Sequence, residues 1–111
     1  MAHWQPNPAH FQFAVILIVD IEKVAAGQYV AQACIGGINV TDAVAYDRID
    51  TAIADQALSI PDGFAHFVQF TYDGMSTETL LPHEAATRAS ALASRLVYLN
   101  ALAHERNRMQ N

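Results

Sequence analysis

The sequence has little cysteine and little positive charge. Cys34 is its only cysteine, which excludes an intrachain disulfide and a thiolate metal cluster. A lone cysteine without an activating signature predicts a buried structural thiol. Six Lys and Arg residues stand against eleven Asp and Glu, for a net charge of −5. An acidic chain without a basic stripe is a poor binder of phosphate backbones, so we expect no direct contact with nucleic acid.

Membrane-spanning runs, leader sequences and cofactor motifs are also missing. The longest apolar segment, residues 11–19, is too short to cross a membrane as a helix. Residues 1–10 contain two prolines and no basic stretch, which is unlike a signal peptide. No P-loop, GxGxxG, GxSxG or HExxH pattern occurs. These absences predict a cytoplasmic protein with no membrane contact, no cofactor and no metal, and they lean against an enzyme without deciding the matter.

The most informative feature that is present lies in residues 11–19, FQFAVILIV, which are apolar on both faces of an extended strand. A strand with one wet face alternates apolar and polar residues, so this segment predicts a central strand that is covered on both sides. The chain is short and 52% hydrophobic. We therefore expect a second copy to cover part of the apolar surface, with a well-filled monomer as the alternative.

Length and composition predict one domain over residues 11–111, preceded by an extended arm over residues 1–10. Pro6 and Pro8 forbid a helix in the arm. The arm also carries Trp4, the only tryptophan, which predicts that the arm docks on its own domain or on a partner chain.

The remaining periodicities predict the order strand-strand-helix, twice. This is an α+β fold with an antiparallel sheet of about four strands and two helices packed mainly on one face. Residues 24–36 also fit helical spacing, but the flanking glycines and β-branched residues favour a strand. The predicted strands cover residues 11–21, 28–40, 64–72 and 75–80, and the predicted helices cover 42–58 and 82–108.

Local signals set the expected ends of these elements. Thr41-Asp42 predicts the N-cap of the first helix, and Asp73-Gly74 predicts a tight hairpin turn. Pro82 suits the first position of the last helix. The apolar seam predicted for that helix contains Ala85, Ala89, Leu92, Leu96, Leu99 and Ala103.

His66, Tyr72 and Glu78 form the candidate ligand-binding set. His66 shares a predicted strand face with Phe70 and Tyr72, so it is either a buried, hydrogen-bonded core residue or a base that works near neutral pH. Glu78 lies on the next predicted strand and could orient His66 across the hairpin. No convergent catalytic set accompanies these residues.

Four aspartates, Asp42, Asp47, Asp50 and Asp55, predict an acidic face on the first helix. Such a face is usually solvated, and the alternative is docking of a basic protein partner. The leading function hypothesis is a small soluble non-enzymatic interaction or regulatory module that acts as a homodimer. Its expected dimer surface is the sheet face that holds Ile16. The alternatives are a ligand-binding protein or enzyme with a pocket around His66, and an acidic inhibitor of a nucleic-acid-binding partner.

Overall fold

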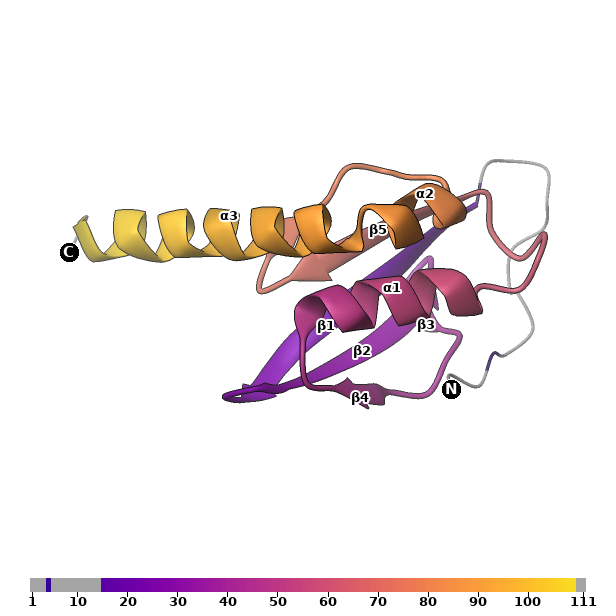
Figure 1. The fold of residues 1–111 in the computed structure, drawn as a ribbon, viewed down its shortest axis with the longest axis horizontal. Coiled ribbons are helices and arrows are strands. Elements are labelled where there is room, and N and C mark those ends of the chain that lie inside the picture. Colours follow the sequence, from indigo (N-terminus) through magenta and orange to yellow (C-terminus); the bar gives the residue numbers. More distant parts are fainter. Residues whose placement is uncertain (1–3, 5–14, 110–111) are drawn as a thin grey trace.

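The computed structural model describes Trp4 and residues 15–109, which form an α+β domain with a mixed sheet. The strand order is β3-β2-β1-β5-β6, and β4 pairs with a different stretch of β2. The helices lie together on one face of this sheet (Figure 1). The elements are β1 Ile16–Ala25, β2 Gln28–Ile35, β3 Ile38–Asn39, β4 Val44–Tyr46, α1 Ile49–Ser59, β5 Phe67–Tyr72, β6 Met75–Ser76, α2 Pro82–Thr87 and α3 Ala89–Met109.

The sheet is mixed, not antiparallel as predicted. β1 and β2 form an antiparallel hairpin, whereas β1 and β5 run parallel, with Leu17 opposite Val68 and Val19 opposite Phe70. Helix α1 lies in the connection that returns the chain to the far side of β1, and such a crossover permits a parallel partner. β1 is therefore the central strand, as predicted, and its long apolar run is typical of a strand with a parallel neighbour.

Within residues 15–109, side chains cover only one face of β1. Leu17, Val19 and Ile21 are at most 1% exposed beneath the helices, whereas Ile16 is 39% exposed and Asp20 is exposed. The described residues of one chain thus do not cover both faces, and cover of the second face by another copy stays a prediction. The buried side chains of β1 pack with those of β2, β5 and the helices in one hydrophobic core.

The first helix starts later than predicted. Residues 42–48 are not helical, because Val44–Tyr46 forms β4 and pairs with β2, and α1 begins only at Ile49. Thr41 is not a helix cap: it is buried, and its hydroxyl accepts the backbone N–H of Ala33 at 2.9 Å. A threonine before an apolar periodicity has the same sequence signature in both roles.

The predictions of a strand after Gly27 and of a hairpin turn at Asp73-Gly74 are confirmed. Residues 28–35 are a strand and not a helix. Asp73 and Gly74 have φ values of 48° and 83°, the two consecutive left-handed residues that a tight hairpin turn of this type needs. The paired part of β6 is short, since only Met75–Ser76 continues the hairpin.

The last predicted helix is present but broken at Arg88, which separates α2 from α3. In α3 the buried residues, Ala89, Leu92, Ala93 and Leu96, all belong to the N-terminal half. The C-terminal half extends beyond the sheet (Figure 1). No helix among the described residues is long and apolar enough to cross a membrane.

Trp4 is the one described residue of the predicted arm, and it docks on its own domain. It is half-buried, forms a β-bridge with Thr41 and packs its ring edge-on against Phe64, with 5.1 Å between centroids. The rest of the arm and residues 11–14 of the first predicted strand lie outside the described residues.

Candidate functional site

His66 is exposed and lies just before β5, so the buried-core interpretation is wrong. Its Nδ1 atom accepts the backbone N–H of Val15 at 3.0 Å, and its own backbone N–H donates to the Val15 carbonyl at 3.0 Å. The ring therefore extends the pairing between the start of β1 and the start of β5, which is a structural role at the ends of these two strands.

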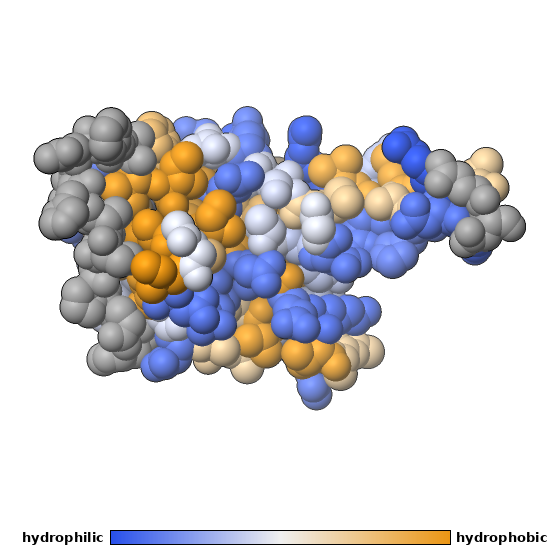
Figure 2. Space-filling view, turned by 180° about the vertical axis from the view of Figure 1, so that it is seen from behind, coloured by the Kyte–Doolittle hydropathy of each residue, from blue (hydrophilic) through white to orange (hydrophobic). Residues whose placement is uncertain are grey.

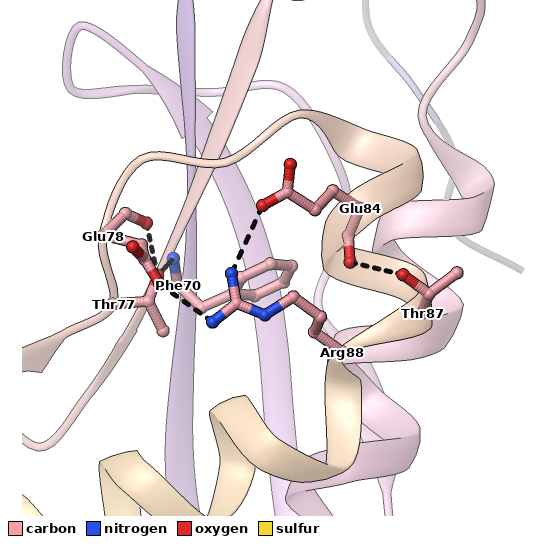
Figure 3. A network of polar contacts seen from close by, with 6 residues as sticks. All are labelled: Phe70, Thr77, Glu78, Glu84, Thr87 and Arg88. Atoms are coloured by element: carbon pink, nitrogen blue, oxygen red, sulfur yellow. Dashed lines mark hydrogen bonds and ion pairs between the residues drawn. The ribbon is translucent and has the colours of Figure 1, made fainter.

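Glu78 does not reach His66. Thr77, the residue before Glu78, lies beside Phe70, because its backbone N–H donates to the Phe70 carbonyl at 2.9 Å. Phe70 is four residues along from His66, which is roughly 13 Å at the usual rise of a strand. Its carboxylate accepts a hydrogen bond from Arg88 at 3.1 Å (Figure 3). Arg88 also reaches Glu84 at 3.2 Å, so this exposed cluster braces the break between α2 and α3.

Tyr72 lies in a different environment from the other two predicted site residues. Its ring packs edge-on against Tyr29 with 6.3 Å between centroids, and burial, the largest cause, raises the pKa of its phenol. It lines an open polar cleft of about 530 Å³ together with Asp73, Asn100 and His104. The structure therefore does not assemble His66, Tyr72 and Glu78 into one site.

Asp73 joins the β5–β6 turn to α3 across this cleft. Its carboxylate accepts a hydrogen bond from Asn100 at 2.7 Å and lies 3.1 Å from Nε2 of His104. The interaction with His104, and then that with Asn100, hold the pKa of the Asp73 carboxyl below its ordinary value. The polar groups of the cleft thus satisfy one another, and they fix where α3 leaves the domain.

The four aspartates predicted to share a helix face do not do so. Asp42 and Asp47 precede α1. Asp50 is paired with the neighbouring Arg48 at 2.9 Å, and Asp55 accepts a hydrogen bond from the phenol of a β4 tyrosine. An acidic docking face on α1 is therefore not formed.

One surface that the described residues leave uncovered is the sheet face opposite the helices. Strand register brings Cys34 beside Ile18 and Phe67 beside Ile16 on this face. Figure 2 shows that its apolar surface gathers toward one end. Cys34 is half-buried here, not a buried core thiol as predicted, and burial followed by the charge of Asp20 raises its pKa.

The other uncovered surface follows the outer side of α3. Four of the nine large hydrophobic residues that are exposed in the described chain lie between residues 97 and 109. Tyr98, Leu102 and Met109 are 55%, 45% and 80% exposed. With exposed residues at the same helical spacing they form what we call the outer stripe of α3, made of Ala91, Arg95, Tyr98, Leu102, Glu105 and Met109.

The outer stripe lies opposite the face that α3 buries. At 100° per residue its members cluster within a sector of about 80°, on the far side of the helix from Leu92 and Leu96. A shallow apolar groove of about 470 Å³ runs along its end, lined by Leu102, Arg106 and Met109 among others. This stripe was not predicted from the sequence, where the core-facing seam is the stronger pattern, although its spacing of four, three and four residues is legible there.

No family model, curated protein or solved structure matches this chain, so its function has to be argued from these surfaces.

Proposed function

We propose that this protein is a non-enzymatic interaction module that acts as a homodimer, and that the outer stripe of α3 joins the two copies. The observation that carries the proposal is the C-terminal half of α3, which extends from the domain with Tyr98, Leu102 and Met109 exposed. This half is tied to the domain through the polar contacts of Asn100 and His104 with Asp73, and a short helical segment with so little apolar packing is marginal in water. A partner that covered the stripe would supply the missing packing.

The energetics favour a weak, reversible dimer. Burying a Leu or Met side chain contributes about 1.5–3 kcal/mol, and two copies bury each residue of the stripe twice. Association costs at least about 4 kcal/mol in lost freedom of motion. The balance is compatible with a dissociation constant in roughly the micromolar range.

The open sheet face, which the sequence suggested as the dimer surface, fits this role less well. Its apolar side chains present somewhat less surface, since Ile18 is half-buried and Ile16 is 39% exposed, against 45–80% for Tyr98, Leu102 and Met109 of the stripe. Polar groups interrupt the face, among them Asp20, whose carboxylate accepts a hydrogen bond from Thr71 at 2.7 Å.

The lone, half-buried thiol of Cys34 on this face suits a reducing cytoplasm.

Light scattering over a range of protein concentrations tests the proposal. The chain should move toward twice its mass of 12.1 kDa in the micromolar range. Leu102→Asp should keep it monomeric. The matched control is Asn107→Asp, which adds the same charge to an exposed position of the same helical half outside the stripe, and it should still dimerise. A wild-type chain that stays monomeric to high micromolar concentration overturns the proposal.

A second candidate function, ligand binding, is favoured by the polar cleft at Tyr72 and not by the surroundings of His66. The cleft offers a carboxylate, an amide and an imidazole within one open space of about 530 Å³. A thermal-shift screen of small polar metabolites tests it. A shift that Asn100→Ala abolishes supports this function, and a screen without shifts counts against it.

A further inference from the structure

We propose that two copies pair through their outer stripes in antiparallel orientation, in the register that sets Arg95 of one copy against Glu105 of the other. This inference rests on the proposed homodimer and adds its geometry. The charges and sizes along the stripe select this pairing from the alternatives.

The spacing along the stripe is that of a two-helix seam. Its six residues are separated by four, three, four, three and four positions, which is the alternation of the core positions of a coiled coil. Three members, Tyr98, Leu102 and Met109, are large and apolar. Two members, Arg95 and Glu105, carry opposite charges, and within the described part of the chain neither forms an ion pair.

Antiparallel pairing about Asn100 makes this seam complementary to itself. A residue that precedes Asn100 by a given number of positions in one helix then faces the residue that follows Asn100 by the same number in the other helix. Tyr98 meets Leu102, and Arg95 meets Glu105, each contact occurring twice because of the twofold axis. At the ends the small Ala91 faces the long Met109. Every apolar residue of the stripe thus meets an apolar residue, and every charge meets its opposite.

Each alternative arrangement of the two helices creates unfavourable contacts along the stripe. A parallel pair would set Arg95 against Arg95 and Glu105 against Glu105, which repel. An antiparallel pair shifted by one heptad sets Leu102 against Glu105 in one direction and Arg95 against Tyr98 in the other. The central register is therefore the one in which no charged side chain is buried against an apolar partner.

The domain leaves room for this pairing. Each α3 contacts its own domain through Leu92 and Leu96, on the side away from the stripe. The extending half of one helix would lie along Ala91–Tyr98 of the other, outside the partner's core. The two domains then sit at opposite ends of the helix pair, and both halves of each stripe are covered.

Charge reversal tests the register. Arg95→Glu and Glu105→Arg should each weaken the dimer about tenfold in sedimentation equilibrium, because two attractive pairs become two repulsive ones. The double variant should restore wild-type affinity. A mixture of the two single variants should form a heterodimer tighter than either homodimer. Arg108→Glu is the matched control, because it makes the same charge change near the helix end outside the stripe.

Each outcome decides something. Weakened single variants without rescue in the double variant overturn the register. If both single variants dimerise like the wild type while Leu102→Asp is monomeric, α3 pairs differently and the proposed function survives. If Ile18→Lys on the open sheet face dissociates the dimer and Leu102→Asp does not, the second copy binds the sheet and this inference fails. A wild type that is monomeric throughout removes the proposed function and the inference together.

Discussion

The uneven cover of β1 allows a stringent test with two neighbouring residues of similar size. Leu17 is fully buried, and Leu17→Ala removes roughly three methylene equivalents worth about 0.8 kcal/mol each. The cavity adds to that loss, so the free energy of unfolding should fall by about 3–4 kcal/mol, within the known range for such changes. Ile16 is 39% exposed on the opposite face, so Ile16→Ala should cost about 1 kcal/mol.

Urea unfolding followed by circular dichroism measures both losses. The three proteins must be compared at one concentration, because a dimer adds a concentration-dependent contribution to stability. The slope of the free energy with urea should stay constant, which shows that only stability has changed. Equal losses of about 3 kcal/mol would refute the reasoning, since they mean that something covers the open sheet face. A loss below 1 kcal/mol for Leu17→Ala would refute the assignment of the core.

Three further outcomes follow from particular contacts. Burial, the largest cause, and the hydrogen bond to Asp55 raise the pKa of Tyr46 to about 12. The folded state holds this proton more tightly than the unfolded state, so stability should fall from about pH 10 toward pH 12, and Tyr46→Phe should flatten that part of a melting-temperature profile. Leu96→Ala, at a fully buried position of α3, should cost about 2–5 kcal/mol in urea melts, and a cost near zero would show that α3 does not pack as described. His66→Gln should cost less than about 1 kcal/mol in the same assay because the ring is exposed and glutamine can still accept from Val15, whereas a loss above 2 kcal/mol would indicate a buried role.

The sequence was a good guide to the elements and a poor guide to their partners. Alternation identified β2 and β5 as strands, and Asp73-Gly74 located the turn correctly. Parallel pairing of β1 with β5 could not be read, because residues alternate in the same way whichever direction the neighbouring strand runs. β4 was missed because its three residues are held by pairing with β2 and carry little signal of their own.

The candidate site failed for a comparable reason. The pairing of His66 with Glu78 overlooked the register of the turn: with Tyr72 opposite Met75, a regular hairpin already sets Glu78 opposite Gln69, and the observed hairpin loosens after Ser76. There Thr77 turns inward, and its hydroxyl accepts the backbone N–H of Phe70 at 3.0 Å. The outer stripe of α3 was legible as a pattern, but its exposure depends on where the sheet ends beneath the helix, which no local pattern reports.

The two uncovered surfaces cannot both pair with themselves in an assembly of only two copies. α3 lies on one face of the sheet, and its outer stripe points away from that sheet. A second copy that binds the stripe therefore leaves the face with Ile16 and Phe67 open, and the dimer presents that face twice on its outside. If that face also bound itself, every copy would have two self-complementary patches, and assembly would continue past two. An assembly that stops at two copies thus implies that only one of the two surfaces pairs with itself. The match of Arg95 with Glu105 favours α3 as that surface, because the sheet face has no comparable complementarity among its described residues.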